Sequence, residues 1–412
     1  MKILFYNHTP QVSGAERVLA MILARLDRHR FEPVVLCPAD GAMRDLAEAQ
    51  GVRCLSVPPL QARFTWRPDA AVRYLASFWR TIRAARGQVV EAAPDLIHAN
   101  SIRAGLVMAA ATVGLAVPVI WHLHDLLPRH PFSTAIRLFA LLSDRNRMLA
   151  VSQAVAAKFQ GRLLRLARRR VPIAVLRNAV ASERFAPDMA AARAFRDELR
   201  LTPNQTEINS TTHQPYIIAA VGMLTPRKGQ LELIRAFAQV VKQLPQAVLV
   251  IAGAPLFNRD EEYQQKLIAT ARELGLSDRV RFLGPRRDVA AIYQAADVLV
   301  VNSWAEPFAL VVLEGLASGA ALVATAVGGT PEMIEHGEQG WLVPPGDQAA
   351  LAAAIVKLLT EPELRTRLAA AGRARAQRQF SLEQYLRELE EFYARAVSPP
   401  PRAGVFARTQ HS

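Results

Sequence analysis

The chain has 412 residues, 51% of them hydrophobic and 21% charged, so it is long enough for two domains and too apolar for a low-complexity disordered protein. Residues 1–200 hold 29 Lys and Arg against 15 Asp and Glu, whereas residues 201–412 hold 21 of each, and the net charge of +14 therefore lies in the N-terminal half. The two cysteines, Cys37 and Cys54, are too few for a disulfide framework and fit a reducing compartment.

Short β-rich apolar runs alternate with helix-length segments, which is typical of parallel sheets with crossover helices. The N-terminal run is too short for a signal peptide and is expected to form the first strand. The strands expected in the first half are Ile3–Asn7, Pro33–Cys37, Arg53–Val57, Leu96–Ala99, Val117–Trp121, Met148–Val151 and Ile173–Leu176. The helices expected there include Ala15–Leu26, Ala70–Ala85 and Thr134–Leu142.

A second series of strands begins after the polar stretch Thr202–Pro215, which is expected to be a surface loop. Its expected strands are Tyr216–Val221, Ala247–Ala252, Val280–Leu283, Val298–Val301 and Leu322–Thr325, and its helices are Leu231–Val241, Tyr263–Leu274, Ala309–Ala317 and Leu351–Leu359. An amphipathic helix is expected over Ser381–Ala396. These patterns predict an N-terminal domain over residues 1–185, a C-terminal domain over 186–377 and a disordered tail over 398–412.

One uncharged stretch of 18 residues, Ala104–Trp121, has the minimum length of a membrane-spanning helix. It is rich in alanine and contains Gly114 and Pro118. We therefore expect a buried helix that ends at Val113 and then a short strand, Val117–Trp121.

The segment from Asn302 to Glu314 follows an expected strand and opens an expected helix. Pro307 stands near the first turn of that helix, where its fixed φ suits helix entry. Free backbone amides next to the positive end of a helix dipole form a phosphate site. The amides expected to do so belong to Phe308, Ala309 and Leu310.

Glu306 lies just before this expected helix and Glu314 two turns inside it, about 12 Å apart at 1.5 Å per residue. That separation excludes a shared-proton pair and suits two carboxylates that bind opposite ends of a long ligand. The alternative is a capping acid and a solvated helix Glu. The apolar neighbours of Glu314 argue against it, because a buried carboxylate needs a partner.

Two further loops follow strands. Gly222 begins the first loop, which carries the adjacent cations Arg227 and Lys228. These two cations suit a leaving diphosphate, and the alternative is a solvated turn. Gly14 lies in the loop before the first helix, where the backbone can approach a ligand. The pattern G-x-G-x-x-G is absent from the chain, which counts against a nicotinamide enzyme.

A fourth group is His122, His124 and Asp125 at the end of an expected strand. Alternation places the two histidines on one face, and Asp125 could orient His124. No His or Cys of suitable spacing supplies the further ligands that a metal would need. A histidine that is merely packed at the strand end is the alternative.

Glu306 and Glu314, with seven residues between them, resemble the E-x7-E signature of retaining GT-B glycosyltransferases of family 4, also called glycosyl transferases group 1. Val327–Glu332 and Gly340–Asp347 resemble the downstream segments of that family. The resemblance implies that Glu306 contacts the donor sugar and Glu314 the ribose. It also assigns Lys228 and Gly222 to the family's G-R-L-x-x-x-K-G segment, His124 to a position near the donor sugar, and Gly14 to the family's first loop. The positions that depart from the family pattern are Ser13, Ala179, Met223, Ala309, Gly315 and Ala321.

The resemblance implies a GT-B fold, in which two Rossmann-like domains face each other across a cleft. Residues 1–185, completed by the helix 378–397, would bind the acceptor, and residues 186–377 the donor. The implied reaction is retaining transfer of a hexosyl group from a UDP- or GDP-sugar to a glycan or lipid-linked acceptor, as in polysaccharide biosynthesis. We expect no cofactor and no metal, because the sequence contains no D-x-D pair. A sugar-nucleotide epimerase, a phosphorylase, and a non-catalytic sugar-nucleotide-binding or membrane scaffold protein remain alternatives.

Two basic stretches, Ala70–Arg86 and Gln160–Arg170, combine apolar residues at helical spacing with arginines. We expect most of the apolar side chains to lie in the core and the arginines to face solvent. The excess charge nevertheless favours an anionic membrane surface as a partner. Nucleic acid is not expected, because no nucleic-acid-binding motif is present. The expected location is the cytoplasm, with peripheral binding to the inner face of the plasma membrane as an open alternative.

Overall fold

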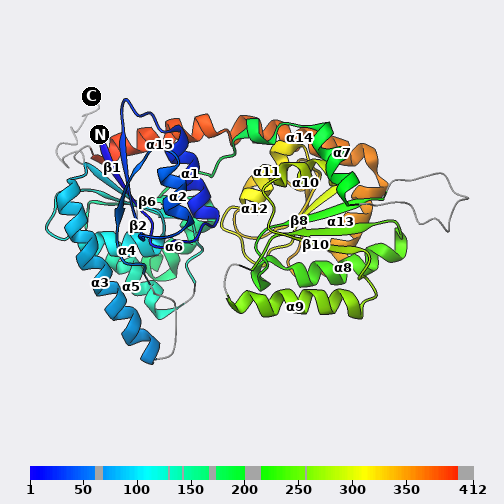
Figure 1. The fold of residues 1–412 in the computed structure, drawn as a ribbon, viewed down its shortest axis with the longest axis horizontal. Coiled ribbons are helices and arrows are strands. Elements are labelled where there is room, and N and C mark those ends of the chain that lie inside the picture. The colour runs from blue at the N-terminus through cyan, green and yellow to red at the C-terminus, as the bar shows by residue number, and fades with distance from the viewer. Residues whose placement is uncertain are drawn as a thin grey trace, which may run out of the picture.

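The structure, a computed structural model, describes residues 1–60, 68–128, 130–141, 143–166, 173–199, 215–255 and 258–397. The expected loop Thr202–Pro215 falls almost entirely outside the described residues, as does the expected tail. Each half of the molecule is built around one parallel sheet with helices on both faces (Figure 1). The chain therefore has the α/β architecture of two doubly wound layers.

The N-terminal sheet has seven parallel strands in the order β3-β2-β1-β4-β5-β6-β7. They are β1 (Lys2–Tyr6), β2 (Glu32–Cys37), β3 (Arg53–Ser56), β4 (Leu96–Ala99), β5 (Val119–Leu123), β6 (Asn146–Ala150) and β7 (Ile173–Val175). The helices are α1 (Gly14–Arg25), α2 (Ala42–Glu48), α3 (Pro68–Ala92), α4 (Ile102–Ala111), α5 (Pro131–Ala140) and α6 (Gln153–Leu166). The strand order reverses between β1 and β4, which opens a crevice beyond their carboxyl ends.

The C-terminal sheet has six parallel strands in the order β10-β9-β8-β11-β12-β13. They are β8 (Ile217–Val221), β9 (Val248–Ala252), β10 (Val280–Gly284), β11 (Val298–Val301), β12 (Leu322–Thr325) and β13 (Trp341–Val343). The helices are α7 (Met189–Glu198), α8 (Gln230–Gln243), α9 (Asn258–Glu273), α10 (Val289–Ala295), α11 (Leu310–Ser318), α12 (Thr330–Met333), α13 (Gln348–Thr360) and α14 (Pro362–Gln379). Here the order reverses between β8 and β11.

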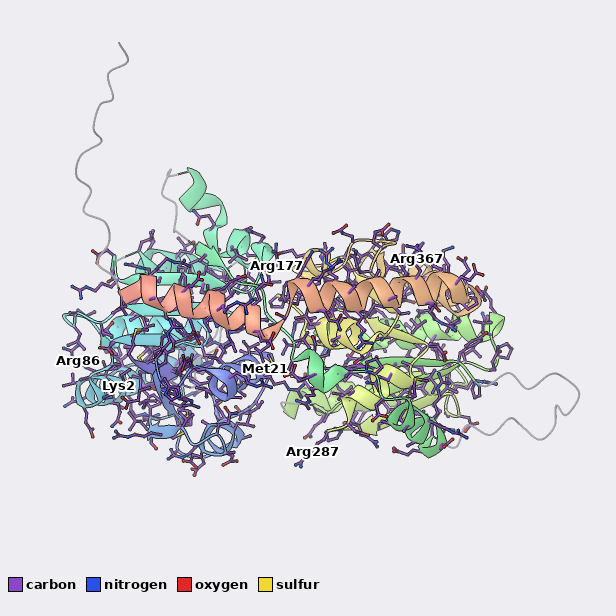
Figure 2. The ribbon with its side chains drawn as sticks, turned by 90° about the horizontal axis from the view of Figure 1, so that it is seen from above. Lys2, Met21, Arg86, Arg177, Arg287 and Arg367 are labelled. Atoms are coloured by element: carbon purple, nitrogen blue, oxygen red, sulfur yellow. The ribbon has the colours of Figure 1, made fainter. Side chains whose placement is uncertain are left out.

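The last described helix, α15 (Leu382–Val397), returns to the N-terminal sheet, and Figures 1 and 2 show α14 and α15 along one side of both halves. Leu389 and Tyr393 are fully buried in one cluster with Ile3 and Phe5 of β1. Burying such a side chain contributes about 1.5–3 kcal/mol. The apolar stripe of α15 therefore fixes the C-terminal end of the chain to the first strand.

Four sequence-based expectations need correction. The strand expected to end at Trp121 is β5, which runs to Leu123, and the preceding helix ends at Ala111. The strand β13 was not expected. Pro307, which was expected near the first helical turn, lies before α11, which begins at Leu310, and its carbonyl accepts a hydrogen bond from Ser152. The apolar stripe of α3 is not mostly core, because Val72 and Trp79 are each 68% exposed.

None of the helices in the described ranges is both long and apolar enough to cross a membrane. The stretch Ala104–Trp121 is divided between α4 and β5, and Val107, Met108 and Trp121 are buried in one apolar cluster.

Candidate functional site

The carboxyl-terminal edges of the two sheets face each other. The Oγ atom of Ser152, at the end of β6, donates a hydrogen bond to the carbonyl oxygen of Pro307, after β11, at 2.9 Å. A pocket of about 540 Å³ lies at this junction. Its lining comes from both halves: Leu126, Ala154, Ala157 and Lys158 on one side and Trp304, Ala305, Val327 and Gly328 on the other. Ligands of doubly wound sheets bind at such edges, so this junction is the candidate site.

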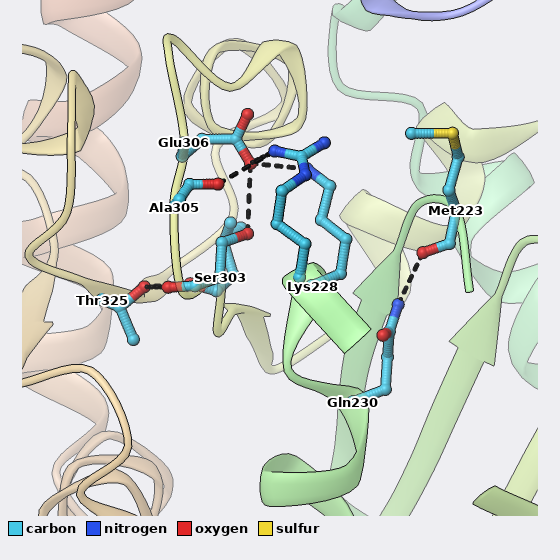
Figure 3. A network of polar contacts seen from close by, with 9 residues as sticks. Met223, Lys228, Gln230, Ser303, Ala305, Glu306 and Thr325 are labelled. Atoms are coloured by element: carbon cyan, nitrogen blue, oxygen red, sulfur yellow. Dashed lines mark hydrogen bonds and ion pairs between the residues drawn. The ribbon is translucent and has the colours of Figure 1, made fainter. Parts of the chain in front are cut away.

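Glu306 is the buried centre of a charged cluster on the C-terminal side (Figure 3). Its Oε2 atom lies 2.6 Å from Nζ of Lys228 and 3.7 Å from Nη1 of Arg227. It also accepts a hydrogen bond of 3.1 Å from Oγ of Ser303. The structure thus brings together the three residues that the sequence assigned to the diphosphate and the sugar. Two cations around one buried carboxylate leave a net positive charge for an anionic ligand.

A short turn before α8 brings the two cations to the end of β11. Gly229 has a left-handed backbone with φ of 66°, and a Cβ atom there would lie 2.0 Å from the carbonyl oxygen of Asn302. The Asn302 amide group donates to the Gly229 carbonyl at 2.9 Å. The amide of Trp304 donates to the carbonyl of Arg227 at 2.8 Å. Only glycine permits this close approach, which sets Lys228 against Glu306.

The residues between Glu306 and α11 form a short non-helical segment. The Gly329 amide donates to the Glu306 carbonyl at 3.0 Å, and a Cβ atom on Gly328 would lie 1.8 Å from that oxygen. Phe308 is buried, with its ring centroid 5.9 Å from that of Phe380. Of the three amides expected at the helix start, only that of Leu310 is in the helix, because Phe308 and Ala309 precede it.

Glu314 lies in the middle of α11, and its Oε2 atom accepts a hydrogen bond of 2.7 Å from the hydroxyl of Tyr293 on α10. This is the partner that a carboxylate among apolar residues requires. Burial raises the pKa of Tyr293, and the nearby charge of Glu314 raises it further. No local pattern indicates Tyr293, because its pairing with Glu314 is a tertiary contact between two helices.

His124 follows β5, and its ring centroid lies 3.9 Å from that of His122. Further polar contacts connect His122 with Tyr393 on α15 through His98. The Nδ1 of His122 lies 3.1 Å from Nε2 of His98, and the Nδ1 of His98 lies 2.7 Å from the hydroxyl of Tyr393. Burial lowers the pKa of His98 and of His124 to about 3, and it lowers that of His122 as well. All three imidazoles are therefore neutral near neutral pH.

The Nε2 atom of His124 is buried and has no hydrogen-bond partner among the residues that the structure describes. A buried ring nitrogen without a partner is available to a ligand hydroxyl. Asp125 and His124 are both among the described residues and make no hydrogen bond with each other. The orienting role expected for Asp125 is therefore not seen, and the His124 ring instead lies against that of His122, tilted by 49°.

The two remaining glycines lie at the facing edges. Gly14 is the first residue of α1, and the preceding Ser13 forms a capping box in which its amide and hydroxyl donate to Glu16 at 2.9 and 2.6 Å. A Cβ atom on Gly14 would meet nothing within 4 Å. Gly222 follows β8, and its amide donates to the Ala252 carbonyl at 2.9 Å. Within the described ranges, no group of three His, Cys, Asp or Glu side chains is placed to hold a metal ion.

Comparisons with known proteins agree with this geometry. A model of the family described as glycosyl transferases group 1 matches residues 202–375, and a model of a glycosyl transferase 4-like domain matches residues 13–204. A D-inositol 3-phosphate glycosyltransferase of Corynebacterium aurimucosum is 39% identical over 187 residues, 44% of each chain. The chain therefore spans less than half of this relative's length.

Two solved structures resemble the whole chain. HepE of Anabaena, solved with UDP-glucose, is 28% identical with a TM-score of 0.79, and the match covers 96% of this chain and 100% of HepE. Sucrose-phosphate synthase of Thermosynechococcus elongatus is 22% identical with a TM-score of 0.76, over 96% of this chain and 98% of that one, and shows the shared fold alone. On these matches and its two facing sheets, the chain belongs to the group 1 family of glycosyl transferases and has the GT-B fold.

Proposed function

We propose that the protein is a retaining glycosyltransferase that moves a hexosyl group from a UDP- or GDP-sugar to an acceptor hydroxyl. The observation that carries the proposal is the cluster of Arg227 and Lys228 around the buried Glu306 where the two sheets face each other. The structure of HepE, solved with UDP and with UDP-glucose, supports a nucleotide diphosphate donor. Residues 1–185 with the helix 378–397 would bind the acceptor, and residues 186–377 the donor.

In this proposal the donor diphosphate lies at the start of α11. Lys228, Arg227 and the amide of Leu310 stabilise the negative charge that grows on the leaving phosphate. Phe308 and Ala309 shape the non-helical segment beside it, and Gly222 lets the backbone after β8 approach the nucleotide. Such preorganised charge lowers the barrier because it needs no rearrangement during the reaction. We propose no divalent ion in this step and expect activity to survive EDTA.

Three side chains position the rest of the donor. Glu306 holds Lys228 and orients the sugar, and Glu314, fixed by Tyr293, accepts hydrogen bonds from the ribose hydroxyls. His124 is neutral and offers its buried Nε2 to a hydroxyl near the anomeric carbon. Gly14 leaves open space at the opposite edge, into which the sugar fits. Closure of the two halves would exclude water and suppress hydrolysis of the donor.

The acceptor is proposed to be a lipid-linked glycan precursor at an anionic membrane surface. The outer side of α3 carries Val72, Leu75 and Trp79, which are 68%, 60% and 68% exposed, next to the exposed Arg80 and Arg83. Exposed apolar side chains flanked by cations suit an anionic bilayer. The second basic stretch contributes nothing to this argument, because the side chains of its arginines lie outside the described residues.

A vesicle sedimentation assay tests the membrane partner. Wild type should bind vesicles containing phosphatidylglycerol more strongly than neutral vesicles, and Trp79→Glu should lose about tenfold in binding. The matched control is Met189→Glu, at an apolar residue of the C-terminal half that is 79% exposed. Equal binding of wild type and Trp79→Glu would contradict the membrane proposal and leave the transferase proposal intact.

The transferase proposal is tested with a panel of UDP-, GDP- and ADP-sugars. A bound donor raises the unfolding midpoint by mass action. The stabilising donor is then given to acceptor mixtures, and the anomeric configuration of the product is read by NMR. Lys228→Ala should abolish transfer, whereas the control Lys242→Ala, at an exposed lysine of α8, should not. Phosphate-dependent release of sugar phosphate would favour a phosphorylase, and donor binding without transfer or hydrolysis would favour a non-catalytic binding protein.

A further inference from the structure

Glu332, on α12 of the C-terminal half, is bound to the N-terminal half by three contacts. Its Oε2 atom accepts hydrogen bonds from the Gln153 amide at 3.0 Å and from Nε of Arg177 at 3.2 Å. Its Oε1 atom accepts from the Ala154 amide at 3.0 Å. The Glu332 side chain is 15% exposed. Figure 2 shows Arg177 at the junction of the two halves.

Through these contacts, a carboxylate of the C-terminal half accepts hydrogen bonds from the free backbone amides at the start of α6 in the N-terminal half. Gln153 and Ala154 are the first residues of α6, whose amides and dipole attract a negative charge. Ser152 completes the arrangement, because its Oγ accepts from the Val155 amide at 3.1 Å and donates to the Pro307 carbonyl at 2.9 Å. Separating the halves would leave two amides and a guanidinium without their carboxylate. Charge-assisted hydrogen bonds of this kind are among the strong ones.

A short path of backbone contacts joins Glu332 to the charged cluster. The Glu332 amide donates to the Gly329 carbonyl at 3.1 Å, and the Gly329 amide donates to the Glu306 carbonyl at 3.0 Å. Glu306 in turn holds Lys228. The segment that carries Glu306 therefore lies between the Lys228 contact on one side and the α6 contacts on the other.

We propose that Glu332 is a positioning residue. Its contacts with Gln153, Ala154 and Arg177, which we call the latch, hold the two halves together and thereby keep Glu306 and its segment in place for transfer. This proposal rests on the proposed function, but Glu332 lies outside the residues assigned to the donor. Glu332 touches no reacting atom, and its contribution is the closed arrangement of the halves. Loss of the latch gives a site that still binds the nucleotide but admits water to the donor.

The variant Glu332→Gln keeps the size of the side chain and removes its charge. We expect kcat for transfer to fall by about tenfold or more, with a change of less than about threefold in the donor KM, because the nucleotide contacts stay intact. The ratio of donor hydrolysis to transfer should rise. Glu332→Asp, which keeps the charge, should recover part of the loss. Arg177→Gln removes one of the three contacts and should give a smaller change in the same direction.

The matched control is Glu335→Gln, because Glu335 is close in sequence and pairs with Arg375 inside the same half. Its kinetics should equal those of wild type. If Glu335→Gln lowers kcat as much as Glu332→Gln, the effect is a local loosening after α12 and the latch is wrong. Wild-type kinetics and an unchanged hydrolysis ratio in Glu332→Gln would also overturn it.

Small-angle scattering tests the latch without any catalytic readout. With saturating UDP, wild type should have the smaller radius of gyration, and Glu332→Gln a larger one with an unchanged circular dichroism spectrum. Identical radii would refute the latch. Because this comparison does not need transfer, a failure of the proposed function and a failure of the latch give different results.

Discussion

The Nζ atom of Lys228 lies 2.6 Å from Oε2 of Glu306, although the two residues are 78 positions apart in the chain. Both side chains are largely enclosed, with exposed fractions of 16% and 7%. Arg227 approaches the same oxygen at 3.7 Å from a more exposed position. A buried pair of this kind costs desolvation energy, so it is better explained by ligand binding than by stability.

Two variants separate the effect of the Lys228–Glu306 pair on stability from its effect on transfer. Lys228→Ala leaves the Glu306 carboxylate in its enclosed position with only the more distant Arg227, and we expect a loss of about 3 kcal/mol in the free energy of unfolding. Adding Glu306→Gln removes the unpaired charge and should restore most of that stability. The double variant should stay inactive, because the cation that faces the phosphate is absent. Urea unfolding and transfer assays check both parts, and an active double variant would contradict the account.

The Tyr293 hydroxyl is expected to matter for the nucleotide rather than for the chemical step. Tyr293→Phe removes the donor that fixes Glu314, which should raise the donor KM several-fold and leave kcat nearly unchanged. We expect a stability loss of about 1–2 kcal/mol, because the hydrogen bond has a charged acceptor. With a 2′-deoxyribose donor the KM difference between wild type and variant should shrink. A Tyr293→Phe enzyme with unchanged KM would show that Glu314 does not contact the ribose.

Because several histidines are buried, we expect acid to destabilise the fold. The pKa of His98 is about 3 in the folded chain, whereas an exposed histidine in the unfolded chain has a pKa of about 6.5. Between these values the unfolded state binds more protons, so stability rises with pH and falls on acidification through that window. Each such histidine removes about 1.4 kcal/mol per pH unit once the pH is well below 6.5.

The measurement compares the free energy of unfolding of wild type and His98→Gln over the range from neutral pH to about pH 4.5. Gln keeps hydrogen-bonding capacity towards Tyr393 and His122 but does not titrate. Its slope should be shallower than that of wild type. His29→Gln, at an exposed loop position, controls for the loss of an imidazole elsewhere. Parallel curves for wild type and His98→Gln would mean that His98 is accessible to protons in the fold.

Much of the fold and part of the site could be predicted from sequence because their signals are local. The strands Val298–Val301 and Leu322–Thr325 agree with β11 and β12 because short apolar runs between turn residues mark buried strands. The glutamates and Lys228 follow predicted strands, so the topology brings them to one edge. The resemblance to a family implies the roles of these residues, and those roles stay predictions.

The remaining features depend on contacts between distant segments. Nothing in the sequence near Glu332 shows that its carboxylate binds the first amides of α6, and Ser152 gives no signal for Pro307. Pro307 lies before α11 rather than in its first turn, and the local pattern does not show this, because a proline suits a first helical turn equally well in isolation. An amphipathic pattern such as that of α3 shows that one side is apolar but does not show whether another element covers it.

The central claim is that Lys228 binds the phosphate at which the donor is cleaved, and calorimetric titration with UDP and UMP measures it most directly. In wild type, UDP should bind about tenfold or more tightly than UMP, because its second phosphate reaches Lys228. In Lys228→Gln the two nucleotides should bind about equally. The same preference for UDP in both proteins would contradict the account.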